Sequence, residues 1–584
     1  MKTAGWLALV VMAVGAGCAA DAGSQSGANL DDEWGMDGAL SPTPPPGKED
    51  SEYRKGLLVN TDTTRTQVWT ARNQWEDTTT PAARAPGLAW GADSGLTWDA
   101  KYGAWIASLA WVPSTDGYST TVQVTTPWGK TLPSPSLECA EMSLFLRITF
   151  SAWYELPLVF ETIDERGHRV YFGHNGVRTA AGRYANSPEF AIKYKDYSKA
   201  PVPATWPKDS TLRTKHIAGG TDDQAALGGD GHAPFGQYLD ELHLNKRVGY
   251  FTVMALDYLG SVNVADSANT YNVVPDSVRA GDSLIERWQR DGIGHTLVVK
   301  AVMQLPGGSK DVTTISGSMP RRQGVRQSGQ SSKSYFTSEY TGGVGMTASG
   351  DLYSHLGGGL KRWRVAKNVG GYWTNTWMAG DEASWINSTD YARIAARPAR
   401  FDQILGQVSP AQQRGELVVQ IADARQHLAQ YPASCSAREN RERAFQTLYE
   451  LSARAFGQSR AEVDGAYRTL EDYVFAALDY TASKTCCWDS STAGMHDIIV
   501  QQAEADEAAA TAAMQCQEPV VFAARTDGYA RWSSYAASIG RGGEWRPWAE
   551  DESCPQRAVA QDTVAPDAGA TLYCELEPTD PGAP

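Results

Sequence analysis

One cysteine and one histidine of this chain are placed where thiol chemistry could take place. Cys139 is the only cysteine between residues 19 and 434, and it opens the apolar segment 140–153, which predicts a buried helix. A thiol at a helix N-terminus feels the positive end of the helix dipole, which favours thiolate. His295 begins a second apolar run that predicts a strand. The two residues together predict nucleophilic catalysis by Cys139 with His295 as base, and the alternative is a cysteine that only fills the core.

The elements around His295 indicate where a third residue would hold the imidazole. Residues 306–309 predict a hairpin turn, and residues 311–315 predict the strand that returns beside the one starting at His295. A residue that orients the ring should lie across this hairpin from His295. Ser318 is the favoured candidate, because it lies about as far after the turn as His295 lies before it. Asp311 is one alternative, although it lies close to the turn and therefore far along the strand. A residue from the Gly-rich segment is another.

The order of these motifs resembles the papain-like cysteine hydrolase superfamily, in particular its NlpC/P60 and CHAP branches. Cys139 matches the nucleophile, Gly281-Asp282 matches a turn that leads into a strand, and Gly294-His295 matches the base. The resemblance spans about residues 125–325 and implies a helix bearing the cysteine packed on an antiparallel sheet. It also implies hydrolysis of amide bonds, with cell-wall peptides as the leading substrate class. Pro133 occupies the position where papain-type enzymes carry an oxyanion-binding glutamine.

Two other functions stay open at this point. A transglutaminase-like acyl transferase would use the same thiol and histidine, with an amine in place of water as acceptor. A non-catalytic binding or scaffold lipoprotein with a degenerate hydrolase domain is the candidate from another class. No cofactor or metal is expected. The net charge of −15 argues against a nucleic-acid partner, because phosphate binding needs concentrated Lys and Arg.

The N-terminus has the pattern of an export signal. Lys2 precedes a short apolar stretch, and small residues lead to Cys18. This resembles the bacterial lipoprotein box, which implies lipidation of Cys18, a membrane anchor and, with Ala19 next, an outer-membrane location in the cell envelope. Residues 19–50 are rich in Gly, Ser, Asp and Pro and predict a disordered tether. The signal peptide is predicted to span residues 1–18.

The remaining cysteines gather in the last third of the chain. They predict a disulfide framework, because the number is even and the chain is exported. The six residues are Cys435, Cys486, Cys487, Cys516, Cys554 and Cys574.

The predicted fold class is α+β with two domains. Residues 51–390 form the hydrolase domain, whose first part, to about residue 135, is predicted to be β-rich with a strand at 105–111. The Gly-rich segment 321–390 is predicted to form loops over this domain. Residues 391–584 form a helical domain, in which a capping box at Ser459 opens one helix that runs through Leu478.

Overall fold

The chain contains two compact units, residues 1–407 and 408–584. The computed structural model describes residues 40–41, 56–60, 63–115, 119–199, 205–217, 224–225, 232–290, 294–305, 307–318, 321–347, 349–406, 408–430, 435–476, 493–516 and 527–544. The predicted lipidation site Cys18 lies outside these ranges, as do Cys486, Cys487, Cys554 and Cys574.

A ten-stranded antiparallel sheet is the centre of the first unit. Its order is β22 (Trp385–Ile386), β13 (Thr270–Val273), β19 (Gly359–Trp363), β14 (Ser283–Glu286), β15 (His295–Gln304), β16 (Lys310–Ser316), β18 (Val325–Gln327), β4 (Thr120–Thr125) and β3 (Trp111–Pro113), with β5 (Thr131–Pro133) also paired to β4. The expected strand at His295 and its returning partner are therefore neighbours in the middle of this sheet.

The described residues also form four smaller antiparallel sheets. They are β1 (Leu40–Ser41), β7 (Val159–Asp164), β8 (Arg169–Gly173), β9 (Gly176–Thr179) and β10 (Gly182–Arg183); β2 (Leu57–Leu58), β21 (Tyr372–Thr376) and β20 (Val365–Val369); β17 (Arg322–Gln323) with β6 (Ser136–Leu137); and β11 (Gln224–Ala225) with β12 (His232–Ala233). Strand β1 falls inside the segment predicted to be a disordered tether.

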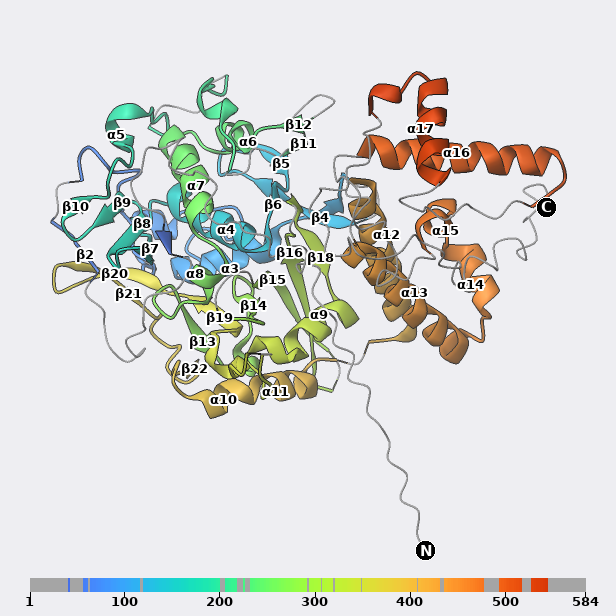
Figure 1. The fold of residues 1–584 in the computed structure, drawn as a ribbon. Coiled ribbons are helices and arrows are strands. Elements are labelled where there is room, and N and C mark those ends of the chain that lie inside the picture. The colour runs from blue at the N-terminus through green and yellow to red at the C-terminus, as the bar shows by residue number, and fades with distance from the viewer. Residues whose placement is uncertain are drawn as a thin grey trace, which may run out of the picture. The chain divides into compact units, whose positions relative to one another are not determined.

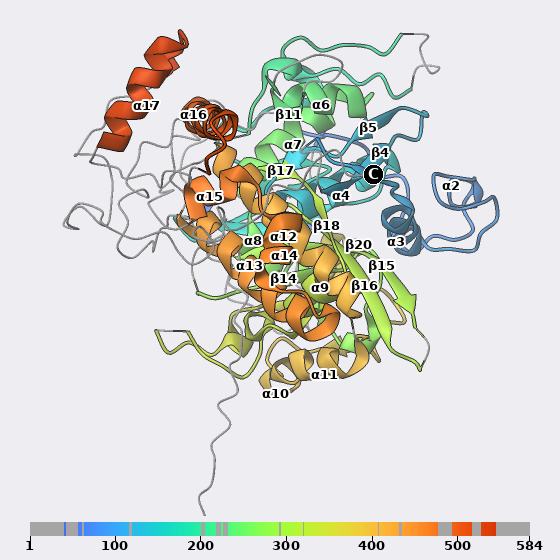
Figure 2. The same ribbon diagram turned by 90° about the vertical axis from the view of Figure 1, so that its right-hand side faces the viewer.

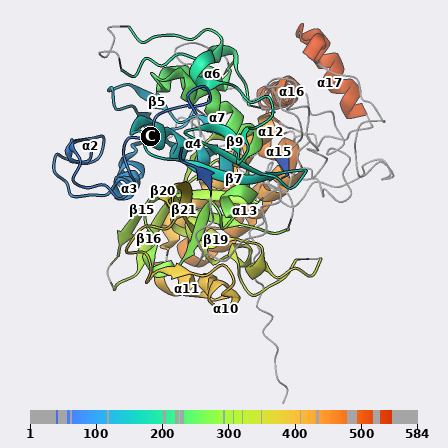
Figure 3. The same ribbon diagram turned by 90° about the vertical axis from the view of Figure 1, so that its left-hand side faces the viewer.

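Helices cover both faces of the central sheet (Figures 1, 2 and 3). The first unit contains α2 (Pro81–Arg84), α3 (Trp98–Ser108), α4 (Cys139–Trp153), α5 (Phe190–Lys193), α6 (Phe235–Leu242), α7 (Lys246–Tyr258), α8 (Ser261–Ala265), α9 (Gly329–Thr337), α10 (Tyr391–Ala395) and α11 (Arg397–Ile404), with short 3-10 turns η1 (Leu212–Thr214), η2 (Pro275–Ser277), η3 (Glu339–Thr341) and η4 (Tyr353–His355). Ile285 and Val298 pack with α4 on one face, whereas Leu297 packs with Phe336 of α9 on the other.

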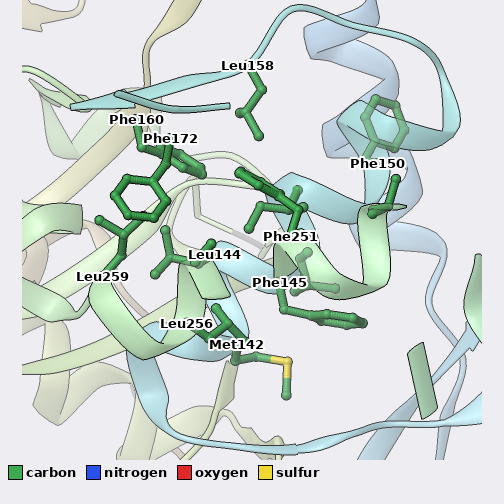
Figure 4. Close-up of a cluster of buried hydrophobic side chains, with 14 of the residues drawn as sticks. Met142, Leu144, Phe145, Phe150, Leu158, Phe160, Phe172, Phe251, Leu256 and Leu259 are labelled. Carbon is green, nitrogen blue, oxygen red and sulfur yellow. The ribbon is translucent and has the colours of Figure 1, made fainter. Parts of the chain in front are cut away.

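Helix α4 is the buried centre of the larger core. Nearly all of its side chains are buried, so apolar residues point in every direction and not along one stripe. Figure 4 shows Leu144 and Phe145 of α4 packed among Phe160 of β7 and Phe251 of α7. The helix was expected over 140–153 and begins one residue earlier, at Cys139 itself.

The prediction of a strand at residues 105–111 is wrong. Residues 98–108 form helix α3, which begins after the N-cap Thr97, whose side chain accepts a hydrogen bond from the backbone N–H of Ala100. Trp98, Tyr102 and Trp105 are buried at helical spacing, and this period decides the structure over the β propensity of the aromatic residues. Only Trp111 enters a strand.

The Gly-rich segment was also interpreted wrongly as loops. It supplies helix α9 and several strands, and β19 lies between β13 and β14 in the central sheet. Residues 359–363 are all buried, so the alternation of polar and apolar residues that marks a half-exposed strand is absent. Gly359 has a φ of 105°, and a Cβ there would lie 2.1 Å from Nη2 of Arg397. That glycine is therefore required by close packing inside the sheet.

The first unit extends past the predicted domain boundary at residue 390. Helices α10 and α11 belong to it, because Phe401 joins the core on the α9 face of the sheet. Arg397 is buried and donates hydrogen bonds to the carbonyl oxygens of Leu360 and Gly358 at 3.0 and 2.6 Å. The second unit then begins at Val408.

The second unit is helical in its described part. It contains α12 (Pro410–Gln430), α13 (Cys435–Phe456), α14 (Arg460–Tyr467), α15 (Leu470–Ala476), α16 (Ala493–Ala512) and α17 (Asp527–Ser538), followed by the 3-10 turn η6 (Gly542–Glu544). Of the predicted disulfide cysteines, Cys435 opens α13 and Cys516 follows α16. The pairing of the six cysteines stays a prediction.

The helix predicted from Ser459 through Leu478 is interrupted. The capping box at Ser459 forms with Glu462, but α14 ends at Tyr467, because Arg468 adopts an extended backbone with ψ 142°. The carboxylate of Asp472 then accepts a hydrogen bond from the backbone N–H of Thr469 at 3.0 Å and α15 begins. The described residues form an α+β protein, and no helix among them has the length and apolar character to cross a membrane.

Candidate active site

The first turn of α4 is held by a buried ion pair beside Cys139. Glu138 is the N-cap, and its backbone N–H donates to the carboxylate of Glu141 at 2.8 Å. Arg321 binds both oxygens of the same carboxylate, with a shortest distance of 2.7 Å. This bidentate pair fixes the start of the helix and offsets the negative charge that two glutamates bring close to the thiol.

The sulfur of Cys139 lies against the first peptide of β15. Cys139 is a free thiol, and its Sγ lies 3.6 Å from the carbonyl oxygen of Gly294. One turn further along α4, the hydroxyls of Ser143 and Ser283 are 2.8 Å apart, which binds the helix to β14. The thiol and the peptide that leads into His295 are thus brought together by the packing of α4 on the sheet.

The imidazole of His295 is held on the opposite face of the sheet from α4. Side chains alternate along a strand, so His295 shares the face of Leu297, which packs towards α9. Its Nε2 lies 3.2 Å from the hydroxyl of Ser316, and its ring is tilted against that of Tyr335 with centroids 5.4 Å apart. The thiol and the imidazole therefore reach the end of β15 from different faces.

The hydrogen bonds of Ser316 favour one tautomer of His295. The Ser316 hydroxyl also lies 3.1 Å from the carbonyl oxygen of Gly317, which can only accept a hydrogen bond. A hydroxyl has one proton to donate, so both contacts are satisfied together when Ser316 donates to Gly317 and accepts from Nε2–H of His295. Nδ1 is then the basic nitrogen of the ring.

Glycines allow the strand ends to approach the first turn of α4. A Cβ at Gly317 would lie 2.6 Å from the carbonyl oxygens of both Leu137 and Glu138. A Cβ at Gly294 would lie 2.5 Å from the carbonyl oxygen of Glu286. Since these neighbours are backbone atoms, neither position has room for a side chain, and the loop after β16 lies directly against the residues that precede Cys139.

The other residues singled out in the sequence lie around this centre. The backbone N–H of Ser318 donates to the carbonyl oxygen of Leu137 at 3.3 Å, whereas the described hydrogen bond to the His295 ring comes from Ser316. Asp311 is opposite Met303, near the far end of β15. The carbonyl oxygen of Pro133 accepts a hydrogen bond from the Tyr238 hydroxyl at 2.8 Å.

The Gly281-Asp282 turn has a structural part in the site. Gly281 has a φ of 90°, and the buried carboxylate of Asp282 binds Arg362 of β19 at 2.7 and 2.9 Å. Burial alone would lower the pKa of Arg362, but the charge and hydrogen bonds of Asp282 outweigh it and the pKa is raised. The turn thereby joins β14 to β19 and positions the strand that pairs with β15.

Sequence reasoning missed Ser316, Glu286 at the end of β14 and Arg287 directly after it. Glu286 is directly opposite His295 in the β14–β15 ladder, and continuing this register sets Arg287 opposite Gly294. Glu286 and Arg287 are 1% and 2% exposed. The signal was present in the sequence as two charged residues at the end of an apolar strand, but only the register shows what they face.

The site contains no group of metal ligands within the described chain. No cluster of three or more His, Cys, Asp or Glu side chains among the described residues is placed to hold a metal ion. Comparisons of the chain with family models, with curated proteins and with solved structures found no match.

Proposed function

We propose that this protein is a cysteine hydrolase that acts on amide bonds, with Cys139 as nucleophile and His295 as base. The observation that carries the proposal is the position of the free thiol at the first residue of α4, 3.6 Å from the carbonyl that precedes His295. Papain-like ancestry and cell-wall peptides as the substrate class belong to the same proposal and rest on the order of the motifs.

The bonding of Ser316 determines how the proton would move. Because the thiol and the imidazole come to the end of β15 from different faces, the proton must pass around the end of that strand. With Nε2 bonded to Ser316, Nδ1 of His295 would accept the thiol proton there, and the thiolate would attack the carbonyl carbon of the amide. The imidazolium then gives its proton to the leaving amine as the C–N bond breaks, which leaves a thioester on Cys139. Water attacks the thioester, His295 accepts a proton from it, and the acid leaves as the thiol is restored.

The start of α4 supports the charged intermediates of this reaction. The backbone N–H groups of the first helical turn have no acceptor within the helix, and the helix dipole adds positive potential there. An oxyanion that forms on a carbonyl attacked by Cys139 would lie close to these groups. The aromatic ring of Tyr335 limits the movement of the imidazole from the other side.

A peptide vinyl sulfone tests the proposal on the full-length protein, because its electrophilic carbon occupies the place of the scissile carbonyl. The expected result is one adduct, mapped to Cys139 by mass spectrometry. Cys139→Ser should abolish it and His295→Gln should slow it by about 100-fold, since the base is lost. Labelling of His295→Gln at the wild-type rate would refute the assignment of His295. Adding a primary amine to a substrate assay then distinguishes hydrolysis from acyl transfer.

A non-catalytic envelope-binding lipoprotein is the second candidate, and burial of the site favours it. Cys139 is 6% exposed and His295 is 4% exposed, so a substrate carbonyl has little open surface through which to reach the sulfur. This candidate predicts that the vinyl sulfone leaves Cys139 unlabelled in the native protein and that the thiol reacts only after denaturation. Anchoring through a lipid at Cys18 is part of both proposals.

A further inference from the structure

Glu286 ends β14 and Arg287 follows it directly, and the two side chains belong to opposite faces of the sheet. Glu286 is paired with His295 in the antiparallel ladder, and directly opposite residues have their side chains on the same face, with Cβ atoms about 5 Å apart. The Glu286 carboxylate therefore belongs to the face that carries the imidazole. It is buried at 1% exposure, where water screens its charge little.

The guanidinium of Arg287 belongs to the other face, beside the thiol. A Cβ at Gly294 would lie 2.9 Å from Cδ and 3.3 Å from Nη1 of Arg287, and the carbonyl oxygen of the same Gly294 lies 3.6 Å from the sulfur of Cys139. A hydrogen bond from Nη2 to the carbonyl oxygen of Arg290 at 2.6 Å fixes the guanidinium in this place.

We propose that Glu286 and Arg287 are positioning residues that polarise the Cys139–His295 pair. The anion lies on the side of the imidazole and favours imidazolium, while the cation lies on the side of the sulfur and favours thiolate. The proton moves only from sulfur to Nδ1, and Glu286 is not a proton acceptor in this step. This inference rests on the proposed function, because it concerns the charge state of the same pair.

The other charges around the pair explain why this arrangement is needed. On the imidazole face, α9 contributes the ring of Tyr335 and α11 contributes Arg397, whose pKa burial lowers to about 9. A protonated Arg397 opposes imidazolium, and Glu286 offsets it. On the thiol face, Glu141 opposes thiolate and is neutralised by its bidentate pair with Arg321. Arg287 adds a cation on the side of the sulfur, and Lys361 of β19, which is buried opposite Ser283, shares that face.

Alkylation of Cys139 by iodoacetamide from about pH 5 to about pH 9 tests the inference in the full-length protein, because the rate follows the thiolate fraction. Glu286→Gln and Arg287→Met should each slow alkylation about tenfold near pH 6 and move the midpoint of the profile upwards. Glu286→Asp keeps the charge and should retain most of the rate. Glu339→Gln changes a neighbouring charge outside the pair and should leave the profile unchanged.

The outcomes separate this inference from the proposed function. Wild-type profiles for both Glu286→Gln and Arg287→Met, with slow alkylation in His295→Gln, would overturn the inference and leave the function standing. Equal slowing in Glu286→Asp and Glu286→Gln would also overturn it, because packing and not charge would then be the cause. An unchanged profile in His295→Gln would overturn both. Circular dichroism checks that each variant is folded.

Discussion

The imidazole of His295 and the hydroxyl of Ser316 are joined at 3.2 Å across the β15–β16 hairpin. Ser316 lies two positions before Ser318, which is the mirror position of His295 that the turn predicts. A bulge between Val299 and Ala301 shifts the register of these two strands. The contact places the orienting hydroxyl on a strand and not on the loop that follows it, so the ring is held by a rigid element.

Replacing Ser316 should therefore affect the reactivity of Cys139 more than replacing Ser318. Ser316→Ala removes the hydrogen bond that orients the ring, worth about 1 kcal/mol, and should lower the vinyl sulfone labelling rate about fivefold. Ser318→Ala is the matched control and should label at nearly the wild-type rate, because the described contact of Ser318 uses its backbone N–H. A lower labelling rate for Ser318→Ala than for Ser316→Ala would instead assign the orienting role to Ser318.

A methyl group at Gly317 should disturb both stability and labelling. Gly317→Ala places a Cβ 2.6 Å from two backbone carbonyl oxygens, so the loop or the start of α4 must move. We expect a loss of about 1–3 kcal/mol, measured by chemical denaturation, and slower labelling of Cys139. Gly91→Ala is the control, since nothing lies within 4 Å of its Cβ, and it should unfold like the wild type. An unchanged midpoint for Gly317→Ala would show that the close approach carries no cost.

A buried histidine makes the protein sensitive to acid. Burial, helped by the nearby charge of Lys246, lowers the pKa of His243 from 6.5 to about 3. Between these values the unfolded chain binds a proton that the folded chain excludes, so stability falls as the pH falls, by about 1.4 kcal/mol per unit for this group. His243→Phe preserves packing on Trp153 and should show a shallower decline from pH 6 to pH 4. Equal slopes in urea titrations of the two proteins would contradict this cause.

The second unit should depend strongly on one carboxylate. Asp472 is buried and binds Arg425 and Arg441, and although burial opposes its charge, Arg441 and Arg425 lower its pKa. Asp472→Asn removes the carboxylate that Arg425 and Arg441 share, although Arg441 keeps its ion pair with Glu442, and should cost about 3–5 kcal/mol. Glu544→Gln breaks the exposed pair with Arg541 and serves as control. Similar denaturation curves for the two variants would show that the buried network is not what holds α12, α13 and α15 together.

Export and anchoring give a prediction that does not depend on catalysis. If Cys18 carries the lipid, Cys18→Ser should move the protein from the membrane fraction to the soluble fraction of its native host. Cys139→Ser should remain in the membrane fraction. Membrane partitioning of Cys18→Ser equal to that of the wild type would exclude the anchor.

The parts of the fold that follow a local period could be predicted from the sequence. Helix 140–153, the strand that begins at His295 and the capping box at Ser459 are specified by short-range signals, and the structure has all three. Fully buried elements are harder to predict, because they do not alternate. Residues 359–363, for example, are buried throughout. Part of α3 was predicted to be a strand because its aromatic and branched residues have high β propensity.

The candidate site shows the same division between local and distant information. Cys139 and His295 are recognisable alone, since each stands at the start of an element. Glu286, Arg287 and Ser316 become meaningful only through strand register and face, which depend on a bulge and on pairings across the sheet. The break at Arg468 depends likewise on ion pairs of its side chain with Glu442 of α13 and with Asp464 of α14.

The place of β19 between β13 and β14 has a consequence for the time at which the site can form. Residues 270–286 cannot complete their ladder until residues 359–363 have been made and inserted between them. Strands that meet across such long stretches of chain close slowly. A ribosome-bound chain that ends before residue 359 would hold Cys139 and His295 before the central sheet is complete, so the candidate site reaches its full form only as a late event.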